Sequence, residues 1–250
     1  MFHDWVSREV FGLKLSVSVA AQYNRVVDIR LTNCGMFLER AGEHVKGDWS
    51  DGGPVVLKLG GSLLDLWDLG ERLLEFSRGR RVLVIPGGGA AADVVRRLDL
   101  YGCLTAEQSH WMAIESMSFN AELLLRTLRG VQVADGVEGD VSRWVVGTPV
   151  VLRIGSWLRG SGRAVAERIP ATWDATSDSI AAIVAGAIGV ESLILGKSCE
   201  PGGVESADLA GAGQVDACFP EFSRGLRLGW CNFRSAALHI RWLQSANVAE

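Results

Sequence analysis

The chain has 250 residues, of which 48% are hydrophobic and 22% are charged, and its formal net charge is −4. This length allows one α/β domain with a sizeable core, and the composition argues against disorder and against a broad nucleic-acid-binding surface. No apolar run reaches the roughly 18 residues of a membrane span, so no membrane partner is expected.

Cysteine usage and the N-terminal sequence indicate the compartment. The apolar patch "LKLSVSVAA" is too short and too interrupted for a signal peptide. The cysteines are odd in number, scattered and without CxxC spacing: Cys34, Cys103, Cys199, Cys218 and Cys231. We therefore expect neither a disulfide framework nor a zinc site, and a cytoplasmic protein.

Residues 1–54 differ from the rest of the chain. They end in "RAGEHVKGDWSDGGP", a polar, glycine-rich stretch that is typical of a linker. Regular patterning begins at Val55. The predicted organisation is an N-terminal extension and linker of unknown role over 1–54, followed by one domain over 55–250.

The domain opens with two strand–helix units. Val55–Leu59 and Val82–Ile85 are short, rich in β-branched residues and apolar apart from Lys58, which indicates buried parallel strands. Leu63–Phe76 and Ala90–Leu98 are predicted as the helices that follow them. This alternation predicts an α/β sandwich with a mainly parallel sheet.

A long helix is predicted next. Thr105 and Gln108 have the spacing of a capping box, apolar residues then recur with helical periodicity to Leu128, and Gly130 stands where a helix should stop. Val131–Ala134 and Pro149–Ile154 are further strand candidates.

The C-terminal third contains one clear strand and one clear helix. "ATSDSIAAIVAGAIG" predicts a helix with Ser or Thr caps ahead of it, and "SLILG" predicts a strand that ends at Lys197. Residues 198–225 are rich in loop formers. The tail "LRLGWCNFRSAALHIRWLQ" suggests a last strand and a closing helix.

The clearest chemical signal is a pair of glycine turns, "LGGSLL" and "PGGGAA", each between a strand and a helix. Glycine permits positive φ, so backbone N–H groups can converge on an anion while the next helix adds its positive end. Glycines also make plain strand–helix turns, but two such turns in consecutive units favour phosphate binding. Neither turn fits the Walker pattern or, convincingly, the dinucleotide pattern GxGxxG.

Three charged residues complete this signal. Lys58 lies near the end of a buried strand, Lys197 follows another strand, and Asp178 lies in the first turn of an apolar helix. Buried charges need counter-charges, so this set predicts a phosphoryl-transfer site, where catalysis relies on positioning and charge. The alternatives are a snorkelling edge lysine for Lys58 and simple dipole compensation for Asp178.

In the order of its motifs, the chain resembles the amino acid kinase superfamily, which includes acetylglutamate, aspartate and uridylate kinases. The motifs are "KLGGS" at 58–62, "PGGG" at 86–89, "WDATSDSIAAIVAGAIG" and "LILGK". The strings "HWMAI", "IPATWDATSDSIAA" and "VDACFPEF" are most similar to the branch in methanofuran biosynthesis. Enzymes of that branch phosphorylate [5-(aminomethyl)furan-3-yl]methyl phosphate to the diphosphate.

This resemblance implies a three-layer αβα sandwich with a mainly parallel central sheet. It implies ATP and Mg²⁺ as cofactors, with the metal held mainly through ATP oxygens and by no assigned residue. The expected partners are a small-molecule phosphate acceptor and further copies of the same chain in a homo-oligomer.

Site residues are carried over by position. The catalytic residues would be Lys58, Asp178 and Lys197. Nucleotide phosphates would be held by Gly60, Gly61 and Ser62. The acceptor would face Gly87, Gly88, Gly89, His110, Trp173 and Asp174.

Three of these acceptor residues rest on separate arguments. Trp173 offers an aromatic face for a flat ring, and Asp174 offers a carboxylate for an ammonium, unless it is only a cap or turn residue. His110 is either a core histidine or a contact to the acceptor phosphate. Arg96 or Arg97 adds positive potential if either faces inward.

One segment departs from the family pattern. Relatives follow the "LILGK" position with a stretch like "VDGVY" that borders the nucleotide, whereas this chain has "SCEPGGVES" at 198–206. Two alternatives therefore stay open. One is another kinase of the superfamily, with an acetylglutamate- or uridylate-type acceptor, and the other is a nucleotide- or oxyanion-binding relative without transfer activity.

Overall fold

The computed structural model describes residues 6–10, 13–17, 53–137 and 144–244. The chain divides into two compact units, Met1–Gly42 and Glu43–Glu250. In the first unit, strands β1 (Val6–Val10) and β2 (Leu13–Val17) pair antiparallel. The second unit contains both glycine turns and the three charged residues discussed above. The division predicted after residue 54 coincides with the start of its first described strand and stays a prediction.

Within residues 53–137 and 144–244, seven strands form one sheet in the order β5-β6-β4-β3-β7-β8-β9. The strands are β3 (Pro54–Leu59), β4 (Arg81–Pro86), β5 (Gln132–Ala134), β6 (Val150–Leu152), β7 (Ser192–Lys197), β8 (Arg227–Asn232) and β9 (Ile240–Trp242). Neighbours are parallel except β9, which is antiparallel to β8. The predicted α/β fold with a mainly parallel sheet is confirmed.

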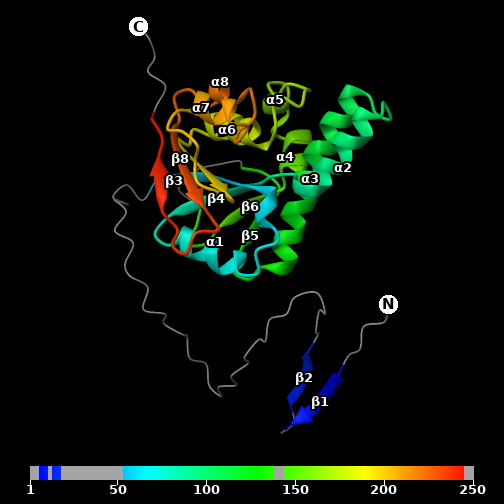
Figure 1. Cartoon of the computed structure of the whole chain (residues 1–250), viewed down its shortest axis with the longest axis vertical. Coiled ribbons are helices and arrows are strands. Elements are labelled where there is room, and N and C mark those ends of the chain that lie inside the picture. Colours follow the sequence, from blue (N-terminus) through cyan, green and yellow to red (C-terminus); the bar gives the residue numbers. More distant parts are fainter. Residues whose placement is uncertain (1–5, 11–12, 18–52, 138–143, 245–250) are drawn as a thin grey trace. The chain divides into compact units, whose positions relative to one another are not determined.

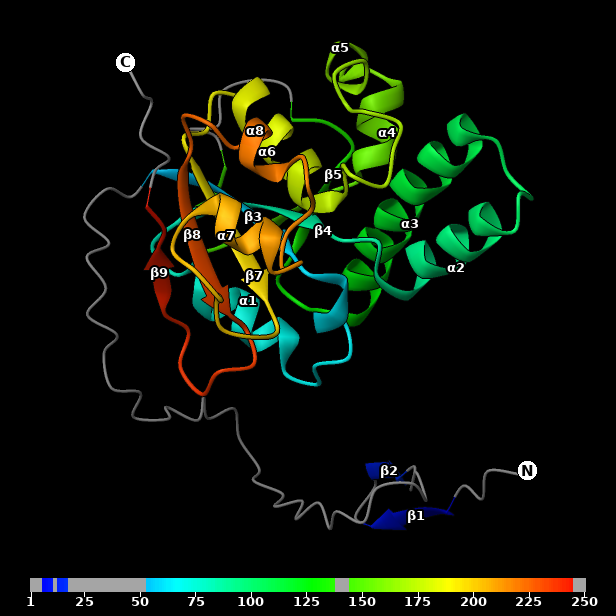
Figure 2. The same cartoon turned by 45° about the horizontal axis from the view of Figure 1, so that its top comes forward.

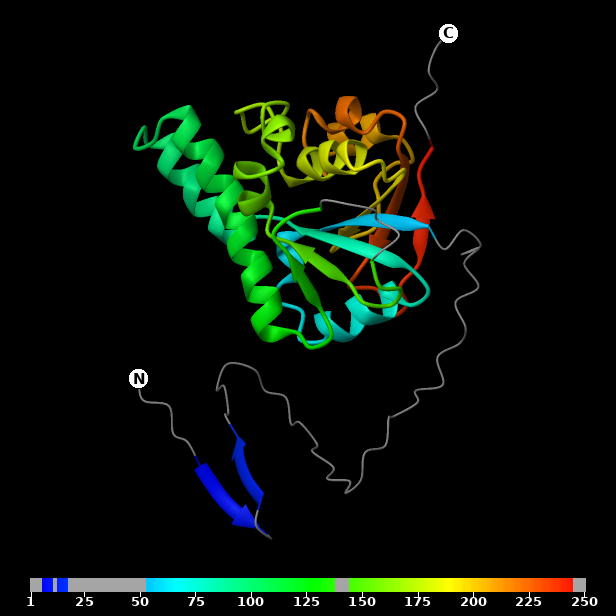
Figure 3. The same cartoon turned by 180° about the vertical axis from the view of Figure 1, so that it is seen from behind.

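Helices cover both faces of this sheet, as Figures 1 and 3 show from opposite sides. One face carries α1 (Leu69–Ser77). The other carries α4 (Ile154–Arg159), α5 (Arg163–Ala166), α6 (Ser177–Ala187), α7 (Ser206–Gly211) and α8 (Phe219–Phe222). Helices α2 (Gly89–Leu100) and α3 (Ala106–Thr127) run side by side at one flank (Figure 2). None of the described helices is long and apolar enough to cross a bilayer.

The alternation of side chains along β3 separates two cores. Val55, Leu57 and Leu59 pack in the core that contains α1, whereas Val56 packs in the core that contains α6. Because successive side chains of a strand point to opposite faces, Lys58 shares the face of Val56. The backbone register of β3 therefore directs this lysine toward the layer of α6.

Most of the predicted elements are present with small shifts of their ends. The capping box is confirmed: Thr105 N–H donates to Gln108 Oε1 at 2.8 Å, and Gln108 N–H donates to Thr105 Oγ1 at 3.2 Å. Helix α3 ends before Gly130, whose φ is +77°. The strand predicted over Pro149–Ile154 is shorter, because Ile154 already belongs to α4.

One helix prediction is wrong in its start and another is wrong as a whole. The helix predicted over Leu63–Phe76 begins only at Leu69, where α1 starts, and is preceded by a short 3-10 turn, Gly61–Leu63, and by tight turns. The closing helix of the tail is strand β9, because the alternating residues after Leu238 pair with β8, with Arg241 opposite Trp230. The loop-rich stretch 198–225 contains the short helices α7 and α8.

Candidate active site

Three charged residues predicted from the sequence meet in the structure. Lys58 Nζ lies 2.9 Å from Asp178 Oδ1, and Lys197 Nζ lies 2.9 Å from Asp178 Oδ2. Lys197 also donates to the backbone carbonyl of Gln214 at 2.6 Å. Their side chains are only 6%, 7% and 14% exposed for Lys58, Asp178 and Lys197. The three residues form one buried charge cluster, hereafter the triad.

The parallel sheet explains why the triad assembles. β3 and β7 are hydrogen-bonded neighbours, with Lys58 opposite Leu195, so both lysines leave the sheet at the carboxyl ends of the strands. Helix α6 starts above this edge and brings Asp178 in its first turn. Ligands in open α/β sheets bind at this edge.

The triad carries a net positive charge. Burial alone would raise the pKa of Asp178, but the two nearby ammonium groups outweigh burial and lower it. Burial and the neighbouring charge of Lys58 lower the pKa of Lys197 to about 8, against the opposing effect of Asp178. Two ammonium groups on one carboxylate leave one positive charge without a counter-charge inside the triad. A polyphosphate would supply that counter-charge, so the residues fit a nucleotide.

The two glycine turns lie against each other. A Cβ atom on Gly61 would lie 2.4 Å from both N and Cα of Gly89, and one on Gly87 would lie 3.0 Å from N of Gly61. Gly89 has φ +51°, a conformation that favours glycine. Only glycine allows these backbones to approach so closely. The turns predicted to hold phosphates therefore form one continuous surface beside the triad.

A buried asparagine holds the second turn. The side-chain amide of Asn120, on α3, donates to the carbonyl of Gly87 at 2.7 Å. Asn120 is 3% exposed. The sequence analysis did not identify it, although a polar residue beside the apolar positions Met117 and Ala121 was a usable signal.

The residues predicted to hold nucleotide phosphates differ in the hydrogen bonds that they already make within the chain. The N–H of Gly60 already donates to the carbonyl of Gly196 at 2.8 Å, which fixes the turn to β7. Ser62 is exposed, and its hydroxyl donates to Ser198 Oγ at 3.3 Å. Arg234, which the sequence analysis missed, donates to the carbonyl of Ser62 at 2.8 Å and brings a guanidinium to this turn.

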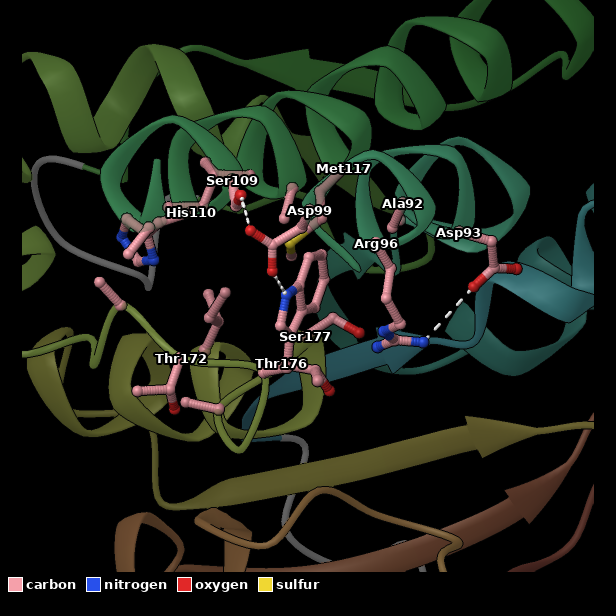
Figure 4. A pocket seen from close by; sticks show the side chains of 18 of the residues that line it. Ala92, Asp93, Arg96, Asp99, Ser109, His110, Met117, Thr172, Thr176 and Ser177 are labelled. Atoms are coloured by element: carbon pink, nitrogen blue, oxygen red, sulfur yellow. Dashed lines mark hydrogen bonds and ion pairs between the residues drawn. The ribbon is translucent and has the colours of Figure 1, made fainter. Parts of the chain in front are cut away.

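A cavity of ≈ 260 Å³ adjoins the second glycine turn. It lies between α2, α3 and the loop 171–177 that leads into α6. Figure 4 shows side chains from the two helices, among them Arg96, Asp99 and His110, pointing toward the loop that carries Thr172 and Thr176. Its walls include the backbone of Gly88 and Gly89 and apolar side chains of α3 such as Ile114 and Met117.

The cavity contains charges of both signs. Asp99 accepts hydrogen bonds from Ser109 Oγ at 2.6 Å and from Trp173 Nε1 at 2.7 Å, and these two bonds lower the pKa of Asp99 (Figure 4). The guanidinium carbon of Arg96 lies 4.6 Å from the centroid of the Trp173 ring. A carboxylate fixed by two hydrogen bonds, an aromatic ring, and the ion pair of Arg96 with the second lining carboxylate, Asp93, thus line the same space.

Some of the predicted acceptor residues line the cavity, and Asp174 does not. His110 and Trp173 line the cavity with Gly88 and Gly89, and burial lowers the pKa of His110. Asp174 is exposed and does not line the cavity; its carbonyl accepts the N–H of Cys218 at 2.9 Å. Two carboxylates that were not identified from the sequence line the cavity: Asp99, and Asp93, which pairs with Arg96 at 3.5 Å.

The departing segment 198–206 is held by side chains of neighbouring elements. Gln214 accepts the N–H of Gly202 at 2.6 Å and donates to the carbonyl of Glu200 at 2.9 Å. Trp230 Nε1 donates to the carbonyl of Cys199 at 2.8 Å.

Among the residues that the structure describes, no group of three or more His, Cys, Asp or Glu side chains could hold a metal ion.

Comparison with known proteins gives one curated relative. The chain is 27% identical over 179 residues to the [5-(aminomethyl)furan-3-yl]methyl phosphate kinase of Methanocaldococcus jannaschii, covering 66% of this chain and 80% of that protein. No family model matches.

The solved structures with a similar fold include UMP kinases. That of Bacillus anthracis has a TM-score of 0.51 and 15% identity, covering 74% of this chain and 88% of that one. That of Ureaplasma parvum has a TM-score of 0.49 and 17% identity, covering 74% and 92%. The first of these likenesses supports the fold alone.

The chain has the fold of the solved UMP kinase structures, and its curated relative is a phosphotransferase. Within the amino acid kinase superfamily the curated relative is the aminomethylfuran phosphate kinase, the branch that the shorter strings indicated. The predicted resemblance is confirmed at both levels.

Proposed function

We propose that this chain is an ATP-dependent kinase that phosphorylates [5-(aminomethyl)furan-3-yl]methyl phosphate, a small phosphate monoester, to the diphosphate in methanofuran-type one-carbon cofactor biosynthesis. The observation that carries the proposal is the buried triad beside two touching glycine turns, next to a cavity with charges of both signs. The acceptor is taken from the named activity of the curated relative.

In this proposal the chain works by positioning and charge. MgATP supplies the γ-phosphoryl group, with the metal carried on ATP oxygens. Lys58 and Lys197 offset the negative charge of the reacting phosphates, and Asp178 keeps the two ammonium groups 2.9 Å from its own oxygens.

The transfer needs no general base. An oxygen of the acceptor phosphate forms a bond to the γ-phosphorus while the bond from that phosphorus to ADP breaks. A phosphate monoester has a second pKa of about 6, so at neutral pH the attacking oxygen carries no proton. The residues of the triad therefore only have to bind, orient and neutralise.

The cavity suits this acceptor in each of its parts. The backbone of Gly88 and Gly89 faces the phosphate end, and Trp173 offers its ring to the furan. Asp99, held by two hydrogen bonds, offers its remaining lone pairs to the ammonium. A dicarboxylate acceptor would meet the carboxylate of Asp99 unfavourably.

ADP release on addition of each candidate acceptor tests the proposal. The acceptors to compare are the phosphorylated aminomethylfuran, its unphosphorylated alcohol, acetylglutamate and uridylate. The expected kcat/KM is highest for the first. Equal or better turnover of another acceptor would overturn the substrate assignment and leave the kinase activity intact. ATP binding without transfer to any of the four would favour the non-catalytic alternative.

A further inference from the structure

Asp216 forms a dense set of hydrogen bonds with the start of α6. Its Oδ2 accepts from Thr176 N–H at 2.8 Å, Thr176 Oγ1 at 2.9 Å and Ser179 N–H at 3.0 Å. Its Oδ1 accepts a short hydrogen bond from Ser179 Oγ. One carboxylate from a distant part of the chain therefore binds two backbone and two hydroxyl donors of a single helical turn.

This carboxylate replaces the cap that the helix lacks. Thr176 occupies the N-cap position of α6, but its side chain makes no capping hydrogen bond there. Free N–H groups at a helix start need acceptors, and a negative charge at that end is favourable. Asp178 lies between the two residues that Asp216 binds. The turn that carries Asp178 is thus fixed on both sides of that residue.

The same short segment also contacts a catalytic lysine. Two residues before Asp216, the carbonyl of Gln214 accepts from Lys197 Nζ at 2.6 Å. Two residues after it, the N–H of Cys218 donates to the carbonyl of Asp174, beside the cavity residue Trp173. Residues 214–218 therefore connect the lysine of the triad with the loop that borders the acceptor cavity.

We infer that Asp216 is a positioning residue for phosphoryl transfer, which fixes the triad through the first turn of α6 and does not touch the reacting groups. The inference rests on the kinase activity and is independent of which acceptor is used. Without the carboxylate, the four donors lose their acceptor and the first turn of α6 loosens. Asp178 then no longer holds the two ammonium groups in one geometry.

The lysine content of the chain allows a test that needs no acceptor. The chain has four lysines, Lys14, Lys46, Lys58 and Lys197, of which two belong to the triad. Acylation of the full chain by acetic anhydride at a series of pH values, read by mass spectrometry, gives the titration of Lys197, with Lys14 and Lys46 as internal references. Asp216→Asn and Asp216→Ala are compared with wild type and with Leu73→Ala, a buried substitution in α1 on the other face of the sheet.

The expected result is a displaced titration of Lys197 in both Asp216 variants. The titration of Lys197 moves to lower pH if Asp178 moves away from the ammonium group, and to higher pH if water reaches that group and relieves its burial. Leu73→Ala should lower the melting temperature and leave this titration in place. A wild-type titration of Lys197 in both Asp216 variants overturns the inference and leaves Asp216 as an ordinary helix cap. Ser179→Ala, which removes one donor only, serves the same comparison where the Asp216 variants do not fold.

The kcat values of the same variants provide a second test of the role of Asp216. Misplacing a catalytic group by about 1 Å costs about 10²-fold in rate, so we expect Asp216→Ala to reduce kcat by roughly 10- to 100-fold and Leu73→Ala to leave kcat unchanged. In the Asp178→Asn background, Asp216→Ala should reduce kcat by less than twofold, because the group through which it acts is already altered. Equal fold losses in both backgrounds would overturn the inference. If no acceptor is turned over by wild type, the proposed substrate fails, and the lysine titration still decides the role of Asp216.

Discussion

Asp178 and Lys197 form a 2.9 Å ion pair that joins the first turn of α6 to the end of β7. The surroundings disfavour the charged form of Lys197, because burial and the nearby ammonium group of Lys58 lower the pKa of Lys197 from 10.5 to about 8. Asp178 opposes this change but does not cancel it. The charge of Lys197 therefore titrates near physiological pH.

The first prediction follows from this titration. As pH rises through about 8, the free enzyme loses the charge of Lys197, so kcat/KM for ATP should fall about tenfold per pH unit. Bound phosphates favour the charged lysine, so kcat should stay constant to higher pH. Lys197→Arg keeps its charge and should show no decline in this range. A wild-type profile that is flat to about pH 10 contradicts the prediction.

As pH rises, the titration of Lys197 should lower kcat/KM but increase this group's contribution to the free energy of unfolding. The loss of activity can therefore be distinguished from alkaline unfolding. The pKa of Lys197 is lower in the folded chain, about 8, than its ordinary value of 10.5. The unfolded chain therefore binds more protons between these values, and this group's contribution to the free energy of unfolding rises with pH there. Thermal melts at each pH should show a folded protein where kcat/KM has already declined.

The second prediction concerns Lys58. Lys58→Met removes one of two ammonium groups and leaves Asp178 paired with Lys197, so the fold should persist. We expect kcat/KM to fall by about 10³ or more, equivalent to about 4 kcal/mol of lost transition-state stabilisation. Lys14→Met, in β2 of the other unit, is the matched control. A folded Lys58→Met protein with wild-type turnover would exclude a catalytic role.

Sequence patterns were sufficient where structure is local. Buried parallel strands such as β3 and β7 are short, mainly apolar runs, and the triad could be predicted because each lysine lies in one of the last two positions of such a strand. The tail was misjudged because apolar residues between Leu238 and Leu243 fit a helical and a strand period over so short a range. Only pairing with β8 decides between them.

The contacts that sequence reasoning missed join distant positions. Asp99 lies 74 residues from Trp173, and Asp216 lies 40 residues from Thr176, to which it is hydrogen-bonded. No periodicity or spacing reports such pairs. Asp174, which the sequence suggested as the acceptor carboxylate, is adjacent to Trp173 in the chain but does not line the cavity that Trp173 and Asp99 line.

The third prediction concerns the extension. Deleting residues 1–53 leaves β3 complete from Pro54 and removes neither ion pair of the triad. We expect a folded kinase unit with wild-type kcat. Differential scanning fluorimetry and the ADP-release assay provide the measurements. A markedly lower melting temperature would mean that the extension contributes to the core and that the predicted boundary is wrong.

The fourth prediction tests how the acceptor's amine is recognised. Asp99→Asn should reduce kcat/KM for the aminated acceptor by about 10-fold or more, the order expected for one charge-assisted hydrogen bond. The loss on an analogue lacking the amine should be much smaller. Asp174→Asn, an identical change at an exposed neighbour of the cavity, is the control and should have little effect on either acceptor. Equal losses on both acceptors in Asp99→Asn would remove the ammonium contact.

The fifth prediction tests the contact between the two glycine turns. In Gly61→Ala the new Cβ would lie 2.4 Å from N and Cα of Gly89, so one turn must move away from the other. Since both partners are backbone, no side-chain rotation relieves the clash, and we expect a stability loss of about 1–3 kcal/mol with weakened binding of ATP and acceptor. Gly186→Ala is the matched control, because its Cβ would meet no atom within 4 Å and the residue is exposed on α6. There the same substitution should stabilise the protein by about 0.5–1 kcal/mol without a change in kcat. Chemical denaturation and ATP titration of both variants measure the difference, and equal behaviour of the two would show that the close approach of the turns is not required.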